Sequence, residues 1–203
     1  TRKTGTKINF LPDPEIFEKT RFKAEEVKSR MHETAYLNPM LTIIYEDCRG
    51  EEVEHIVYHE EEGIRGFVKD LNKNTEVLHD VVYFKGESEG ITVEAAFQYT
   101  NEFHENILGF CNNIFNAEGG THITGFKTVF TTVINSYARE LGILKEKENF
   151  CFVSRFVLAR SSVLRIFAAF SAQEMTAFNV SKFLSKKSWI SSPVTFAVAL
   201  AAS

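Results

Sequence analysis

The sequence predicts an α+β fold, and three observations support this prediction. The chain of 203 residues is 44% apolar and 25% charged, which is the composition of an ordinary globular domain. Stretches with alternating apolar residues occur beside stretches with apolar residues three or four apart, so strands and helices share the chain. The two kinds of element do not alternate strictly, which favours α+β over a doubly wound parallel sheet.

The composition changes abruptly near residue 150. All 11 glycines precede this point, whereas serine occurs 3 times in residues 1–150 and 10 times in residues 151–203. The first part carries 17 basic against 26 acidic residues, a net charge of −9, and the second carries 6 against 1, a net of +5. We therefore expect a folded domain followed by an atypical tail.

Residues 1–60 predict a strand, a helix and a hairpin. Thr6–Leu11 alternates polar and apolar residues, as a strand does, before a Pro-Asp-Pro segment. Lys23–Leu37 has apolar residues four apart and is an expected helix that the following Asn-Pro ends. Leu41–Asp47 and Glu52–His59 flank a polar turn and predict a β-hairpin.

Residues 64–142 predict two more helices and three strands. Ile64–Asn72 places its apolar residues on one helical face. Val81–Lys85, Ile91–Tyr99 and Asn106–Asn112 are expected strands. Thr124–Leu141 carries the broadest apolar stripe, and the glycine that follows it suits a left-handed helix cap.

The tail is not expected to complete the sheet of the first part. Phe152–Ala169 contains arginines five residues apart, which fits neither a strand face nor a tight helical face. A strand there would bury unpaired charges, at a cost of several kcal/mol per ion. We therefore expect an unpaired sheet edge and loosely attached helices. A pair of basic amphipathic helices is the alternative.

Cysteine and histidine spacing argues against a disulfide framework and a metal site. The three cysteines, Cys48, Cys111 and Cys151, are far apart and suit a reducing cytosol. His55 and His59 lie on an expected strand, where this spacing separates them by ~13 Å, so a solvated loop is expected rather than a metal pair. No apolar stretch approaches ~20 residues, so no membrane partner is expected.

A glycine-rich turn before the last helix is the candidate ligand loop. Gly119, Gly120, Thr121 and His122 precede the expected helix, where paired glycines can cradle an anion. No Gly-Lys-Ser/Thr follows as in a phosphate-binding loop. A tight turn capped by Thr121 or Thr124 is the alternative. Spacing alone identifies no catalytic residue.

Nine short segments form a pattern in which order and spacing are informative. They are Phe10–Phe17, Ala35–Pro39, Tyr83–Phe84, Val93–Tyr99, Glu105–Leu108, Asn112–Ile114, Glu118–His122, Gly125–Lys127 and Leu144–Lys147. The most specific is Gly-Gly-Thr-His after Asn-Asn-Ile. Together they resemble the gyrase B and topoisomerase IV ATPase-subunit family over about residues 1–150, with the resemblance nearer to gyrase B.

This resemblance implies a domain arrangement. Residues 1–13 would end a GHKL ATPase domain, residues 14–150 would form an incomplete transducer resembling a ribosomal-protein-like fold, and residues 151–203 would be an atypical tail. In the family, the transducer couples ATP binding to DNA strand passage in an ATP-dependent type II DNA topoisomerase.

The resemblance also implies cofactors and partners. The intact enzyme would use ATP and Mg²⁺, and this chain alone would bind neither of them. The partners would be DNA, bound weakly and non-specifically, the gyrase A subunit and a second gyrase B chain. The implied location is the cytoplasm, or an organelle in a plastid-bearing source.

The sequence departs from the family pattern after residue 150. The family's transducer carries a Gln-Thr-Lys loop whose lysine touches the γ-phosphate, and this sequence contains no Gln-Thr-Lys. Cys151–Arg155 replaces the expected stretch, as a frameshift, a rearrangement or unspliced sequence would produce. A further departure is Thr132, where family members often carry arginine.

Lys127 matches a basic family position that faces the hole through which DNA passes. A cation there contacts phosphates without reading sequence, and an ordinary exposed lysine is the alternative. Three interpretations of function remain open: a piece of a type II topoisomerase that is inactive alone, a non-catalytic binding or scaffold module, and a non-functional gene remnant.

Overall fold

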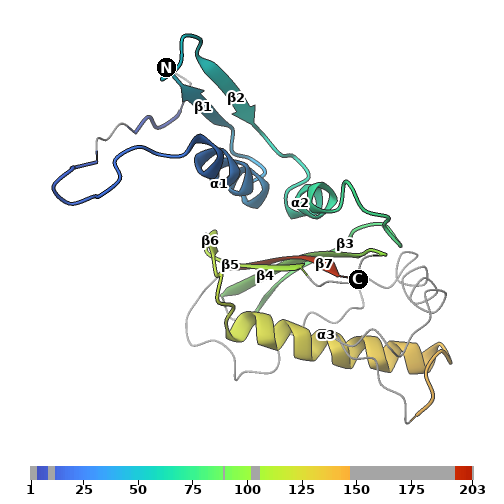
Figure 1. Cartoon of the computed structure of the whole chain (residues 1–203). Helices are drawn as coiled ribbons and strands as arrows, with labels where there is room; N and C mark the ends of the chain where they lie inside the picture. The colour runs from blue at the N-terminus through green and yellow to red at the C-terminus, as the bar shows by residue number, and fades with distance from the viewer. Residues whose placement is uncertain (1–3, 9–11, 89, 102–105, 147–194, 203) are drawn as a thin grey trace.

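The chain forms a five-stranded sheet between helices, with a smaller helix-and-hairpin unit beside it (Figure 1). The computed structural model describes residues 4–8, 12–88, 90–101, 106–146 and 195–202. The mixture of helices and strands confirms the α+β prediction. Among the described helices, none has the length and apolarity that a bilayer crossing needs.

The smaller unit consists of α1 (Ala24–Leu37) and the antiparallel hairpin of β1 (Ile43–Asp47) and β2 (Glu54–Tyr58). The predicted helix and hairpin are therefore confirmed. In the hairpin turn, the Arg49 guanidinium pairs with the Asp47 carboxylate, holding the pKa of that carboxyl well below its usual range. Arg49 also donates a hydrogen bond of 2.7 Å to the carbonyl of Phe22, which ties the hairpin to the segment before α1.

The strand predicted at Thr6–Leu11 is wrong for residues 6–8, which have no regular structure. Residues 9–11 lie outside the described residues. An alternating pattern predicts a strand only where a neighbouring strand takes up its backbone hydrogen bonds. Within the described part of the chain, no strand pairs with residues 6–8.

Within the described residues, the main unit has five strands and two helices. In chain order its elements are α2 (Ile64–Leu71), β3 (Val82–Ser88), β4 (Ile91–Tyr99), β5 (Asn106–Cys111), β6 (Ile114–Phe115), α3 (Thr121–Glu140) and β7 (Thr195–Ala202). The predicted helices and strands between residues 64 and 142 are confirmed. The strand order is β3-β4-β7-β5-β6.

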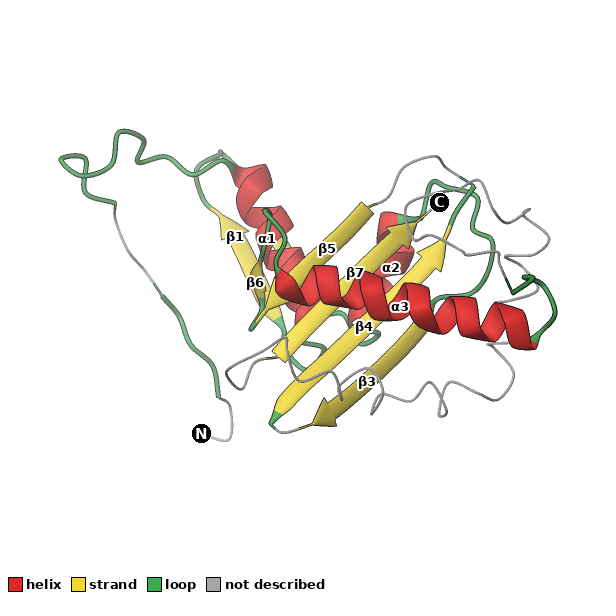
Figure 2. Ribbon diagram, turned by 90° about the horizontal axis from the view of Figure 1, so that it is seen from below, coloured by secondary structure: helices red, strands yellow, loops and turns green. Residues whose placement is uncertain are grey.

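Helices cover both faces of this sheet (Figure 2). On one face, Phe126 and Phe130 of α3 pack against β3 and β4, and the Phe130 ring lies edge-on to Phe97 at 4.9 Å between centroids. On the other face, Phe67 of α2 stacks on Tyr36 of α1 at 5.0 Å. Both faces are apolar because alternate residues of β4 point to opposite sides of the sheet.

The tight turn between β5 and β6 connects the two units. Asn112 and Asn113 both have positive φ angles, of 48° and 64°, as a two-residue hairpin turn requires. The Asn113 side-chain amide donates a 2.9 Å hydrogen bond to the Asn38 side chain just after α1. The carbonyl of Asn113 accepts a 2.9 Å bond from Arg30. The orientation of α1 is therefore linked to the sheet edge.

The prediction that the tail leaves the sheet incomplete is wrong for residues 195–202. β7 lies between β4 and β5, parallel to β4 and antiparallel to β5 (Figure 2). The prediction considered Phe152–Ala169, where arginines recur, and that segment lies outside the described residues. Thr195–Ala202 has no charged residue, so the cost of burying charge does not apply to it.

The pairing of β7 also has a consistent register. Val198 and Leu200 are in register with Ala95 and Phe97 of β4, whose row faces α3. Ala199 is in register with Ala96, whose row faces α2. The backbone register of β7 thus continues the residue-by-residue pairing of β4 along its whole length.

Removing β7 should destabilise the domain. A chain ending at residue 150 and a chain ending at residue 194 should both lose more than about 2 kcal/mol of unfolding free energy, because each exposes the inner edges of β4 and β5. Urea unfolding of the two truncated chains and the full chain measures this loss. An unchanged midpoint for the chain ending at residue 194 would show that β7 is not part of the cooperative unit.

Candidate functional site

The space beside the glycine turn before α3 is occupied by the side chain of His122. Gly119 has a φ of +78°, and its N–H donates to the Asn116 carbonyl at 3.0 Å. A Cβ atom on Gly120 would lie 2.8 Å from the His122 ring, so the imidazole folds back over this glycine. Partial burial lowers the pKa of His122 below its ordinary value of 6.5. This ring is therefore neutral at neutral pH, which weakens its attraction for an anion.

Helix α3 begins three residues earlier than predicted, and neither threonine caps it. Gly120 is the N-cap residue, without a side-chain capping bond, and its carbonyl accepts N–H bonds from Ile123 and Thr124 at 3.1 Å. Thr121 and His122 therefore lie in the first helical turn. The capping prediction was wrong because the N-cap position is occupied by Gly120, which has no side chain to accept a bond from the first N–H groups of the helix.

Gly109 of β5 makes room for this first turn. A Cβ atom on Gly109 would lie 2.5 Å from Cδ1 of Ile123 and 3.1 Å from Nε2 of His122. Such distances are too short for ordinary packing, so the absence of a side chain lets the start of α3 approach the sheet. Among the predicted loop residues, His122 is thereby fixed against β5, while Gly119 and Gly120 shape the turn.

Lys127 is half-buried on α3, about 8 Å along the helix axis from His122 at the standard rise per residue. Exposed threonines lie beside it, and the hydroxyl groups of Thr128 and Thr132 donate to the carbonyls four residues earlier at 2.9 Å. Lys127 is the only charged residue between positions 121 and 138. The predicted loop and the predicted cation therefore lie on the same helix.

A buried polar cluster lies at the C-terminal end of β4. Asn72 donates a 3.0 Å hydrogen bond to the Gln98 side chain, and Gln98 donates to the carbonyl of His79 at 2.7 Å. The N–H of Tyr99 donates to Nε2 of His79 at 3.0 Å. Desolvation lowers the pKa of His79, so its neutral form is favoured in the folded chain.

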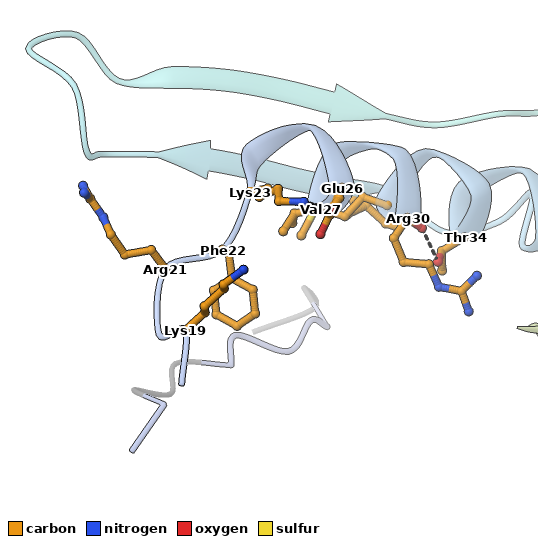
Figure 3. A pocket seen from close by; sticks show the side chains of 10 residues that line it. Lys19, Arg21, Phe22, Lys23, Glu26, Val27, Arg30 and Thr34 are labelled. Carbon is orange, nitrogen blue, oxygen red and sulfur yellow. Dashed lines mark hydrogen bonds and ion pairs between the residues drawn. The ribbon is translucent and has the colours of Figure 1, made fainter. Parts of the chain in front are cut away.

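A groove of about 730 Å³ runs along most of the length of α1 (Figure 3). Its walls come from α1 and from the segment before it. The lining residues are Lys19, Arg21, Phe22, Lys23, Glu26, Val27, Arg30, Met31, Thr34 and Ile43. The sequence prediction missed this groove. The cations between positions 19 and 30 could have indicated a basic surface. Only the net charge of residues 1–150 was considered, and it is negative.

His55 and His59, for which a solvated loop was expected rather than a metal pair, are separate from these features. His55 lies on β2 beside Glu46, with 3.3 Å between Nδ1 and the carboxylate oxygen, and Nδ1 of His59 lies 3.2 Å from the carbonyl of Leu41. In the described ranges, histidine, cysteine and carboxylate side chains form no group of three that would hold a metal ion.

Comparisons with known proteins identify the class to which this fold belongs. The gyrase B ATPase domain of Thermus thermophilus, solved with an aminocoumarin, superposes with a TM-score of 0.56 and 32% identity, covering 68% of this chain and 37% of that one. The gyrase B protein of Myxococcus xanthus superposes with a TM-score of 0.59 over 96% of this chain and 49% of its own. At 21% identity, this second match shows the fold alone.

Proteins with similar sequences belong to the B subunits of type IIA topoisomerases. Residues 63–156 match the family described as DNA gyrase B. The DNA topoisomerase 4 B subunit of Staphylococcus epidermidis is 47% identical over 149 residues, or 73% of this chain, and that of Enterococcus faecalis is 44% identical over 165 residues, or 81%. The family match covers 94 of the 203 residues of the chain. The chain spans about a quarter or less of these relatives, 22% and 24% of their lengths.

The sequence prediction that placed the chain nearer gyrase B than topoisomerase IV stays a prediction. Relatives named for topoisomerase IV match in sequence, and solved structures named for gyrase B match in fold. The three domain boundaries also stay predictions.

Substituting Gly109 should disturb the start of α3. Gly109→Ala should lower the unfolding free energy by about 1–3 kcal/mol, because the added methyl group overlaps Ile123. Gly5→Ala is the matched control, since a Cβ atom there has nothing within 4 Å. Urea unfolding compares the two, and equal midpoints would contradict the close approach of α3 to β5.

His79 should make stability depend on pH. Its pKa is lower in the folded chain than the ordinary 6.5, so the unfolded chain binds more protons below about pH 6.5. Stability should therefore be fully present above that pH and fall as the pH drops towards the folded pKa. His79→Gln should reduce the loss of unfolding free energy between about pH 7.5 and pH 5.5, which urea unfolding at both pH values measures. An identical loss in both proteins would assign the effect to other groups.

Proposed function

We propose that this chain supplies the transducer module in the ATPase chain of a type IIA topoisomerase, which couples ATP binding to DNA strand passage. The observation that carries the proposal is the 47% identity over 149 residues to the B subunit of a DNA topoisomerase 4. The fold shared with the gyrase B of Thermus thermophilus supports it. No specific observation favours the scaffold or gene-remnant alternatives.

The packing of α3 suits a coupling role. Phe126, Phe130 and Ile134 are each 1% exposed and anchor the helix against the sheet. A closely packed interface resists small deformations, so the sheet and α3 move as one body. The outer face of the helix, which carries Lys127, would therefore follow any displacement of the sheet.

The described residues do not fit a nucleotide site. They include no Gln-Thr-Lys segment and no cluster of three metal-ligating side chains. In this proposal, ATP and Mg²⁺ belong to the intact enzyme and are bound outside the described residues. The A subunit, a second copy of the ATPase chain and DNA are its partners in the intact enzyme.

DNA binding by this chain should be weak, non-specific and dependent on salt. Residues 1–150 have a net charge of −9, so attraction to phosphate is local. Lys127→Ala should weaken binding to duplex DNA and lower the slope of log K against log salt by about 1. Lys73→Ala, at the end of α2, is the matched control. Fluorescence anisotropy at several salt concentrations measures both slopes, and equal slopes would remove Lys127 from the interface.

The purified chain should not hydrolyse ATP. Without a lysine at the γ-phosphate, the charge that develops in the transition state lacks its stabilising partner. Steady-state phosphate release is the measurement, with an intact gyrase B protein as positive control. Turnover that persists after contaminating ATPases are removed would contradict the proposed division of labour between this module and an ATPase domain.

A further inference from the structure

The groove beside α1 combines a basic rim with an apolar floor. Lys19 and Arg21 are exposed and form no ion pair with any described residue. Lys23 and Arg30 extend the positive rim along α1, and Glu26 is the only acidic residue among the described residues of the lining. The described lining holds four cations and one carboxylate, within residues 1–150 of net charge −9. Since Lys23 pairs with Glu26 and Arg30 with Glu33, the unpaired positive charge of the groove is that of Lys19 and Arg21.

The floor of the groove is made of apolar side chains. Val27, Met31 and Ile43 are half-buried, and Phe22 is 53% exposed at the open side. Figure 3 shows Lys19 and Phe22 on the segment before α1, across from the helical residues. A ligand that fits must therefore satisfy cations at the rim and bury apolar groups at the floor.

Fixed contacts hold part of the rim in place. Arg30 pairs with Glu33 at 2.9 Å and donates to the carbonyl of Asn113, so its position is set by the sheet edge. Lys23 pairs with Glu26 at 2.6 Å. Lys19 and Arg21 remain available to a ligand. The groove thus joins preformed charges with two cations that have no partner among the described residues.

We propose that this groove binds an acidic segment of a partner protein that carries apolar side chains between its carboxylates. Carboxylates of the segment pair with Lys19 and Arg21, and its apolar side chains lie on Val27 and Met31. From residue 23 to residue 34 the wall of α1 extends about 16 Å at the helical rise. That length fits about five extended residues or three helical turns of the partner.

Other occupants fit the observations less well. Nucleic acid would place evenly spaced phosphates against an aliphatic floor and beside the Glu26 carboxylate. The chain's own tail, residues 151–203, has a net charge of +5 and would be repelled by the rim. A second copy could offer the acidic turn at residues 51–54, but Glu54 of that turn already pairs with Lys28 at 2.7 Å.

A binding assay with the full chain tests this proposal. The probe is a fluorescein-labelled ten-residue peptide that alternates glutamate with leucine and alanine, and its control replaces every glutamate with lysine. Anisotropy should show binding of the acidic peptide alone, weakened by salt. The double variant Lys19→Glu/Arg21→Glu should weaken binding by roughly tenfold or more, since both rim contacts become repulsive.

Two further variants test whether peptide binding depends on the groove itself or on the net charge of the chain. Lys7→Glu/Lys73→Glu makes the same charge change outside the groove lining and should leave affinity within about twofold. Phe22→Ala removes a half-exposed aromatic ring from the groove lining and should weaken peptide binding while circular dichroism shows an unchanged fold.

Three outcomes would overturn the proposal. The first is equal binding of the lysine peptide, and the second is an equal effect of the matched charge reversal. The third is preferential occupation by another ligand: competition by a 20-base-pair duplex that the rim reversal abolishes would assign the groove to nucleic acid. Concentration-dependent self-association in light scattering, abolished by the same reversal, would assign it to a second copy.

Discussion

The backbone groups on the inner edges of β4 and β5 impose the constraint on which the rest of the structure depends. These two strands do not pair with each other, and β7 lies between them. Each edge carries amide and carbonyl groups that cost free energy if they are buried without partners. Pairing with a strand that begins at residue 195 satisfies both edges at once. The layer of α3 and the layer of α2 both pack on the sheet that results.

The sheet fixes the positions of the two proposed binding surfaces. Gly109 of β5 brings the start of α3 close, and α3 carries Lys127. The turn after β5 fixes Arg30 and, through it, one wall of the groove beside α1. The two surfaces to which we assign partners, the outer face of α3 and the groove, are therefore both fixed relative to β5.

Local patterns sufficed to predict most elements of the fold. The period of the apolar residues located α1, α2 and α3 and the strands from β1 to β5, because each of these elements buries one face or one stripe. The strand at residues 6–8 failed because alternation does not supply a partner. β7 was missed because its partners are 84 or more residues away in sequence, and because the arginines of Phe152–Ala169 were taken to represent the whole tail.

The site was predictable in a more limited way. The Gly-Gly-Thr-His segment indicated the turn and the family, but the fold-back of His122 over Gly120 depends on the approach of β5, which the sequence does not display. The groove needed tertiary structure, because Ile43 comes from β1 while its cations come from the segment before α1 and from α1 itself. The resemblance to a gyrase B domain was specific enough to predict the family that the comparisons found for residues 63–156.

A disulfide between β5 and β7 tests the position of β7 most directly. Cys111 of β5 is opposite Phe196 in the antiparallel register, and such partners have Cα atoms about 4.5–5.5 Å apart, within the range that a disulfide spans. In a chain with Cys48→Ser and Cys151→Ser, Phe196→Cys should form an intramolecular disulfide with Cys111 under mild oxidation, detected by mass spectrometry of the digested protein. Ala197→Cys, on the opposite face of β7, should not form it. Equal crosslinking of both variants, or of neither, would contradict a sheet completed by β7.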